Sequence, residues 1–253
     1  MGQQSSAKQP GKMKEDIKTM NRRSFVSSAA TGLAAFATLG IAGESQAQLV
    51  YMKFDWKLSE FNQLAKNPAK LKQVYDVTRI AEGGYLNNIK NSLNGLYFGF
   101  GVPKEQIKIV AAQHGPANLL NYDDFIWNKY QIGAWLNITD PSTGQPAVKN
   151  PFYPSKAGKA LHYSSENPDS PESLYQDASI QGLQSRGVKL LACHTATEEQ
   201  AQALIKHNNL TQKPEDIVEE MLAHTLPDVL VVASMVAAIA LLQTEGHFTY
   251  ITV

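Results

Sequence analysis

Short apolar runs, each followed by a turn and a helical stretch, constrain the fold of this chain more than any other feature. Residues 188–193 (Val-Lys-Leu-Leu-Ala-Cys) follow Gly187 and have the length and composition of a buried strand. Comparable runs occur at residues 106–112, 228–233 and 247–253. Strands that alternate with helices require right-handed crossovers. The sequence therefore predicts an α/β fold, doubly wound and flavodoxin-like, with a mainly parallel sheet of about five strands and helices on both faces.

The helices are predicted from apolar periodicity and from their end signals. Residues 82–101 carry apolar side chains at helical spacing and end in a Gly-Phe-Gly-Val-Pro segment. The same signals predict helices over residues 171–185, 195–208, 214–223 and 234–243. Between residues 137 and 171 the periodicity is lost in a segment rich in Pro, Gly, Ser, Asn and Tyr. This segment is predicted to be a long surface loop inserted into the domain, either a functional lid or a dispensable decoration.

The first 47 residues have the layout of a removable export signal. A polar, lysine-bearing stretch leads to Arg22 and Arg23, and an uncharged run rich in Ala, Gly, Ser and Thr follows to Gly43. Paired arginines before a weakly apolar run are typical of the twin-arginine route, and Ser45-Gln46-Ala47 fits a cleavage site. We therefore expect a signal over residues 1–47, a mature domain over residues 48–253, and a periplasmic location. An uncleaved anchor is the alternative, but its many Ser, Thr and Gly residues would make a poor membrane helix, so membrane contact is expected only during export.

Charge and motif content exclude several functional classes. The chain of 253 residues has no net charge, but residues 1–47 hold six of its 23 basic and three of its 23 acidic residues, which leaves 17 basic and 20 acidic residues in the mature part. A mildly acidic domain without a Lys/Arg cluster is not expected to bind nucleic acid. The sequence has no glycine-rich nucleotide motif, and its histidines lack metal-ligand spacing, so no cofactor and no metal are expected.

Three of the predicted strands end in residues that could bear chemistry. They are His114, Gly115, Cys193, His194, Ser234 and Met235. Because ligands collect outside the carboxyl ends of parallel strands, we expect these residues to share one crevice. Cys193 is the only cysteine, so an intramolecular disulfide is excluded. A lone thiol in an oxidising compartment is buried, paired between chains or chemically used.

All three of these strand ends carry a family resemblance. Residues 187–193, followed by a helix, resemble the cysteine-bearing strand end of DsrE-like proteins, a sulfur-relay superfamily that includes the Tus and Dsr sulfurtransferase subunits. Residues 228–246 are similar to the closing strand, Ser-containing turn and helix of that superfamily, and His114-Gly115-Pro116 after a strand fits the same group. The resemblance covers roughly residues 106–253. It implies that Cys193 carries sulfane sulfur, that the chain forms a homo-oligomer (a trimer or hexamer), and that sulfur donor or acceptor proteins are its partners.

Two functions remain open. In the first, the protein is a sulfurtransferase-like persulfide carrier in which His194 or His114 assists deprotonation of Cys193; this predicts an accessible thiol with a lowered pKa. The turn at residues 195–200 departs from the small-residue and Arg-Gly stretch associated with carrier subunits. In the second, the domain is a non-catalytic module that binds a small molecule or a protein, which predicts a buried, inert Cys193 and a pocket lined by aromatics. The aromatic residues near the loop, expected to be core or subunit contacts more often than a ligand cage, are Tyr122, Phe125, Trp127, Tyr130 and Trp135.

Overall fold

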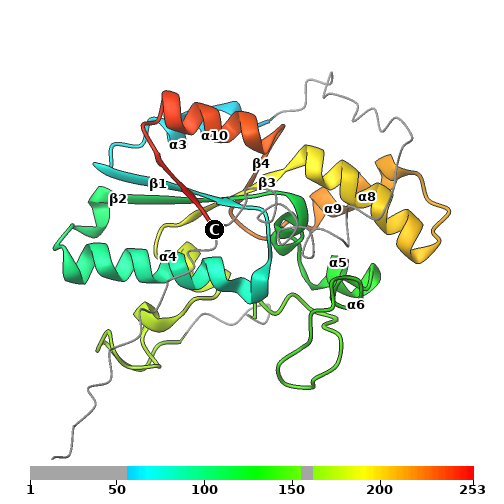
Figure 1. The fold of residues 1–253 in the computed structure, drawn as a ribbon, viewed down its shortest axis with the longest axis horizontal. Coiled ribbons are helices and arrows are strands. Elements are labelled where there is room, and N and C mark those ends of the chain that lie inside the picture. The colour runs from blue at the N-terminus through cyan, green and yellow to red at the C-terminus, as the bar shows by residue number, and fades with distance from the viewer. Residues whose placement is uncertain (1–55, 155–161) are drawn as a thin grey trace, which may run out of the picture. The chain divides into compact units, whose positions relative to one another are not determined.

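The computed structural model describes residues 56–154 and 162–253, and these are built around a sheet of five parallel strands (Figure 1). The order of the strands across the sheet is β4-β3-β2-β1-β5. Their bounds are β1 Leu71–Val77, β2 Ile107–Gln113, β3 Lys189–Cys193, β4 Val229–Val232 and β5 Thr249–Thr252. The predicted doubly wound α/β architecture is confirmed. The predicted signal at residues 1–47 lies outside the described residues.

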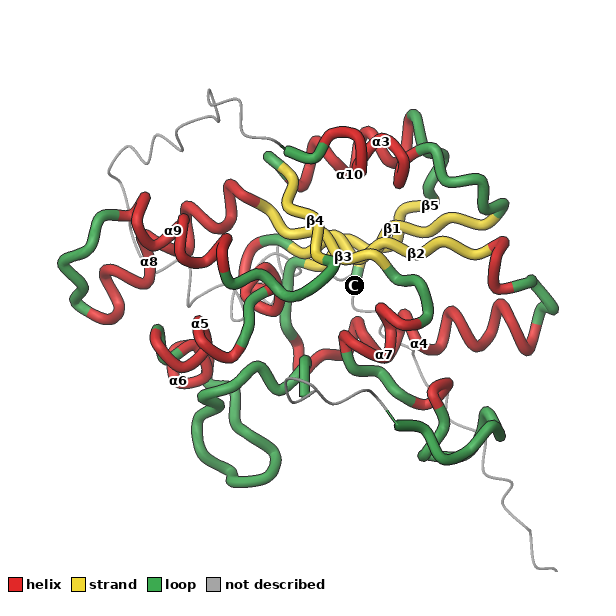
Figure 2. The backbone as a smooth tube through the Cα atoms, turned by 180° about the vertical axis from the view of Figure 1, so that it is seen from behind, coloured by secondary structure: helices red, strands yellow, loops and turns green. Residues whose placement is uncertain are grey.

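Helices cover both faces of the sheet, as the crossovers require. α3 (Leu58–Ala65) and α10 (Met235–Thr244) lie on one face, and α4 (Gly84–Asn94) and α7 (Ile180–Ser185) lie on the other (Figures 1 and 2). The other α-helices in the described residues are α5 (Asp124–Lys129), α6 (Ile132–Leu136), α8 (His194–Asn208) and α9 (Pro214–Ala223). Within the described ranges, no helix combines the length and the apolar character needed to cross a bilayer.

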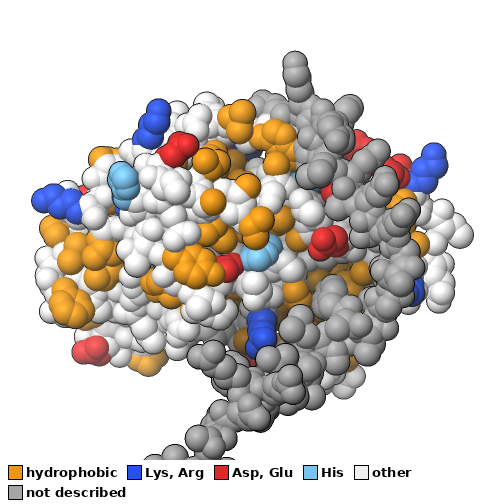
Figure 3. Space-filling model, turned by 45° about the horizontal axis from the view of Figure 1, so that its top comes forward, with side chains coloured by type: hydrophobic (Ala, Val, Ile, Leu, Met, Phe, Trp, Pro, Cys, Tyr) orange, Lys and Arg blue, Asp and Glu red, His pale blue; other side chains and the backbone are white. Residues whose placement is uncertain are grey.

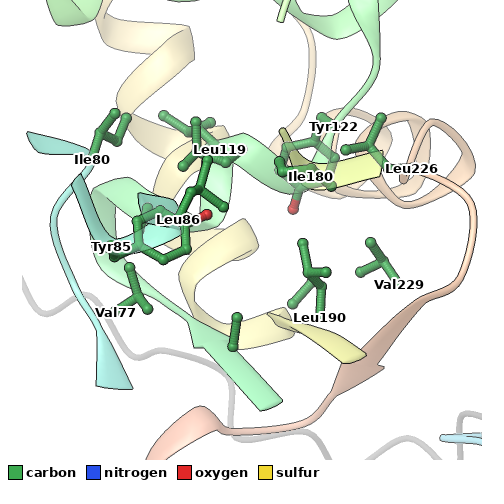
Figure 4. Packing of buried hydrophobic residues seen from close by; sticks show 14 of the residues in the cluster. Val77, Ile80, Tyr85, Leu86, Leu119, Tyr122, Ile180, Leu190, Leu226 and Val229 are labelled. Carbon is green, nitrogen blue, oxygen red and sulfur yellow. The ribbon is translucent and has the colours of Figure 1, made fainter. Parts of the chain in front are cut away.

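Each face of the sheet has its own apolar core. Along β3, Leu190 and Ala192 pack into the larger cluster, on the α4 side, while Leu191 and Cys193 pack into the smaller one, beneath α10. Figure 4 shows side chains of the larger cluster, among them Leu190, gathered on one side of the strands, between the strands and the helices that cover them. Because both faces are covered, the strand reads as a continuous apolar run, which is why it was recognisable from sequence.

The first strand of the sheet was missed by the sequence prediction. β1 lies between β2 and β5 and pairs with both in parallel register. Its sequence, Leu-Lys-Gln-Val-Tyr-Asp-Val, mixes polar with apolar residues, so it lacks the apolar run that identifies the other internal strands. Helices α3, α5 and α6 were also not predicted.

Two predicted helices are shorter than expected. The helix predicted at 82–101 is α-helical from Gly84 to Asn94 and continues as a π-helical turn over Gly95–Gly99, so the apolar stripe does not extend to Phe100, which is 81% exposed. The helix predicted at 171–185 is wrong over its first half. A 3₁₀ turn starts after Ser173, and α7 starts after Ser179; each serine side chain accepts a backbone N–H and begins a separate element.

In the described part of the loop predicted at residues 137–171 there is no helix, only an isolated bridge between Thr139 and Pro146. It is nevertheless anchored. Asn150 is buried, and its Nδ2 donates hydrogen bonds to the backbone oxygens of Leu120 and Tyr122, each at 2.9 Å. Residues 155–161 lie outside the described part. The hydrogen bonds of Asn150 attach the segment before residue 155 to the domain. Neither a free lid nor a dispensable decoration would need such an attachment.

Candidate functional site

Cys193 lies at the carboxyl edge of the sheet, where β3 ends and α8 begins. The residue is 5% exposed and belongs to the smaller core cluster. Backbone N–H groups of Ala196, Met235 and Thr195 face its sulfur, and each of these lowers the pKa of the thiol. Burial has the larger effect, so the pKa of the Cys193 thiol is raised above its ordinary value. The accessible, low-pKa thiol that a persulfide carrier was expected to have is not what the structure contains.

A buried polar network holds the backbone of Cys193 in place. Its N–H donates to Asn118 Oδ1 at 2.8 Å, and its carbonyl accepts a hydrogen bond from Thr197 Oγ1 at 2.9 Å. The Thr197 hydroxyl also lies 2.6 Å from the Tyr122 hydroxyl. No sequence pattern indicated this network, because its members are scattered singly over the turn after β2 and the first turns of α8. Their common role is to fix the end of β3.

His194 is directed away from the thiol of Cys193. It is buried, meets Trp56 edge-to-face with 5.1 Å between ring centroids, and its Nδ1 lies 3.5 Å from Glu198 Oε1. It lines a pocket of about 220 Å³ together with Val229 and Val231, whose side chains belong to the opposite face of the sheet from Cys193. Burial lowers the pKa of His194. The structure therefore does not bring His194 to the sulfur that it was expected to deprotonate.

His114 continues β2 by one residue and is held by partners that the sequence prediction missed. Its Nε2 lies 2.6 Å from Asp76 Oδ1, and the hydroxyl of Tyr250 donates to the other oxygen of Asp76. Gly115 follows in the left-handed region, at φ +53°, and its carbonyl accepts a hydrogen bond from Gln200. Three neighbouring strands thus contribute one polar side chain each to this part of the edge.

Two of the strand ends that were expected to share a crevice are neighbours in the sheet. Gln113 lies beside Ala192 at the end of the paired register, and the next residues along the two strands are His114 and Cys193. Because side chains alternate along a strand, both of these residues are on the α10 face. Ser234 occupies the N-cap position of α10, although its side chain makes no capping hydrogen bond. The Met235 side chain is buried, so only its backbone N–H faces the edge.

The surroundings of this edge carry few other candidates for chemistry. On the side that carries α3 and α10, apolar and polar side chains are interspersed and charged ones are scattered (Figure 3).

Of the five aromatic residues considered above, Tyr122, Trp127 and Tyr130 are buried in the larger cluster. Phe125 instead stacks on His224, with 4.1 Å between ring centroids. In the part of the chain that is described, no group of three or more His, Cys, Asp or Glu side chains could hold a metal ion.

Comparisons with known proteins add no family to these observations. No protein-family model matches the sequence, and neither curated proteins nor solved structures give a match. The resemblance to DsrE-like proteins, and the homo-oligomer that it implies, therefore stay predictions.

Proposed function

We propose that the domain is a DsrE-like module that binds a small molecule at the carboxyl edge of its sheet, and that Cys193 has a structural role there. The burial of Cys193 carries this proposal. A sulfur carrier attacks its donor as a thiolate and then holds the sulfur where a partner can reach it. A thiol that is 5% exposed, with its pKa raised by burial, meets neither requirement in the folded state.

The same edge keeps a polar group that a ligand can reach. The His114 side chain is 21% exposed and is fixed by Asp76. Parallel α/β sheets bind their ligands outside the carboxyl ends of the strands. His114, at the end of β2 between β1 and β3, is therefore the group on which we centre the binding function.

The test is the mass of the purified protein after exposure to a polysulfide donor, with Cys193→Ser as the control, together with the rate of thiol alkylation across pH. We expect no added sulfur, and slow alkylation that accelerates only above the pH at which ordinary thiols ionise. The denatured protein should be alkylated quickly at the same pH, which shows that the fold protects the thiol. A gain of one sulfur atom by the wild type alone would overturn the structural role of Cys193.

Sulfur carriage on Cys193 is the second candidate, because three backbone N–H groups face the sulfur and would stabilise a thiolate. In that reaction the Cys193 proton passes to His114, and the thiolate attacks the outer sulfur of a donor persulfide. The donor's S–S bond breaks, the donor leaves as a thiolate, and Cys193 becomes a persulfide. The mass measurement separates this candidate from the first one directly.

A further inference from the structure

Asp76, His114 and Tyr250 form a hydrogen-bonded set across three neighbouring strands. β1 carries Asp76 and lies between β2, which leads into His114, and β5, which carries Tyr250. In the sheet register Asp76 lies beside Ala112, two residues before His114, and Val74 lies beside Tyr250. Because side chains alternate along a strand, all three lie on the face covered by α10.

Both oxygens of Asp76 are used within this set. Oδ1 lies 2.6 Å from His114 Nε2, and Oδ2 accepts the Tyr250 hydroxyl. The hydrogen bond to Asp76 raises the pKa of Tyr250, which keeps the phenol proton in place. A carboxylate only accepts hydrogen bonds, so Nε2 of His114 must carry the proton that they share. In the neutral ring, Nδ1 is then left with its lone pair.

The three side chains of this set are partly exposed to solvent. The side chains of His114 and Asp76 are 21% and 17% exposed, and Tyr250 is more exposed than either. A ligand can therefore reach His114, while Asp76 and Tyr250 hold the ring in one orientation and one tautomer. A group that is oriented in this way by a carboxylate is a proton acceptor of fixed direction.

We propose that Asp76, His114 and Tyr250 form a binding site for a small uncharged molecule that donates a hydrogen bond from an alcohol or thiol to Nδ1 of His114. This inference rests on the proposed binding function and names the chemistry of its site. His114 contacts the ligand, and Asp76 and Tyr250 are positioning residues. An anion is disfavoured, because it would meet the Nδ1 lone pair and the charge of Asp76.

The first measurement is the tautomer of His114, read from long-range ¹H–¹⁵N spectra of the imidazole rings of the full-length protein at about pH 8.5, where imidazoles are neutral. The resonances are assigned with His114→Gln. We expect the Nε2–H form in the wild type and in Asp169→Asn, which removes an exposed carboxylate elsewhere. Asp76→Ala, which removes the acceptor, should lower the fraction of the Nε2–H form toward that of an unrestrained imidazole, and Tyr250→Phe should lower it less. An Nδ1–H form in the wild type, or an Nε2–H fraction unchanged in Asp76→Ala, overturns the positioning role.

The second measurement adds a probe to the same samples. 2-Mercaptoethanol, which carries an alcohol and a thiol, should shift the His114 resonances saturably, and Asp76→Ala should weaken this binding about tenfold, as expected for one oriented hydrogen bond. Sodium phosphate should leave the resonances unchanged. If phosphate shifts the His114 resonances and 2-mercaptoethanol does not, the proposal of an uncharged alcohol or thiol ligand is overturned. The expected tautomer with no shift from either compound retains the positioning geometry and counts against the proposed binding function, so the two failures are distinguishable.

Discussion

The backbone N–H of Cys193 donates to Oδ1 of Asn118 at 2.8 Å, across 75 residues of sequence. The amide nitrogen of Asn118 lies within hydrogen-bond distance of Tyr122, Thr197 and Gln200. A single buried side chain thus joins the turn after β2, the end of β3 and the first turns of α8. The position of Cys193 at the edge of the sheet depends on it.

We expect Asn118→Ala to lower the free energy of unfolding by about 3 kcal/mol, because it leaves several buried polar groups without a partner. Equilibrium urea denaturation of the purified protein measures this. Asn91→Ala, on the exposed side of α4, is the matched control and should be neutral or slightly stabilising. A loss for Asn118→Ala no larger than that of the control would mean that the network does not stabilise the edge.

Gly133 in α6 is expected to tolerate no side chain. A Cβ at this position would lie 2.1 Å from the backbone oxygen of Ala147, so the anchored loop would have to move. We expect Gly133→Ala to cost about 3 kcal/mol or more and to lower the melting temperature. Gly95→Ala is the control, because nothing lies within 4 Å of its added Cβ and its backbone is helical. This control should be neutral or stabilise by about 0.5 kcal/mol. Equal melting temperatures for the two variants would contradict the close packing of residue 147.

Burial of His194 should make stability depend on pH. Because burial lowers its pKa, the unfolded chain takes up this proton before the folded chain does. The stability contributed by neutral His194 is therefore present above the ordinary histidine pKa of 6.5 and is lost as the pH falls toward the lower folded value. Urea denaturation at about pH 7.5 and pH 5 measures how much the free energy of unfolding falls between the two pH values, and this fall should be smaller for His194→Gln than for the wild type. For His162→Gln, at an exposed position, the fall should equal that of the wild type. Parallel losses in all three proteins would exclude His194 as the source.

Export is expected to depend on the two arginines of the N-terminal segment. Replacing Arg22 and Arg23 together by lysine keeps the charge but removes the feature that is typical of the twin-arginine route. We expect the doubly substituted protein to stay in the cytoplasm with its full mass, while the wild type appears in the periplasm without residues 1–47. Lys12→Arg and Lys14→Arg, which change basic residues outside the pair, should leave export unchanged. Periplasmic recovery of the doubly substituted protein would rule out this route.

The architecture was predictable where strands are buried on both faces. The run at residues 188–193 is apolar almost throughout because α10 covers one of its faces and the α4 side covers the other. β1 escaped prediction because Lys72, Gln73 and Asp76 interrupt its apolar residues. Asp76 is also the residue that contacts His114, so a polar position that weakened the strand signal belongs to the proposed binding site.

The candidate site was predictable only as far as the strand ends. The rule that carboxyl ends share an edge predicted that His114 and Cys193 lie at one edge, and the strands that lead into them, β2 and β3, are neighbours in the sheet. It could not show that α10 closes over Cys193, because that contact joins segments distant in sequence. Nor could the order of residues along the chain show that β5 pairs with β1, which is what brings Tyr250 to Asp76.

The hydrogen bond between Tyr250 and Asp76 spans 174 residues. The final strand, β5, pairs with the first strand, β1. The same pairing brings Tyr250 to Asp76 and completes the proposed site. In a chain cut short before Thr249, β1 to β4 could still pair with one another. One side of β1 would then be unpaired, and Oδ2 of Asp76 would lose the hydrogen bond from the Tyr250 hydroxyl. His114 would then be held by a carboxylate that is itself loosely held. The pairing of β5 with β1 is therefore expected to affect the orientation of His114 at the proposed binding site.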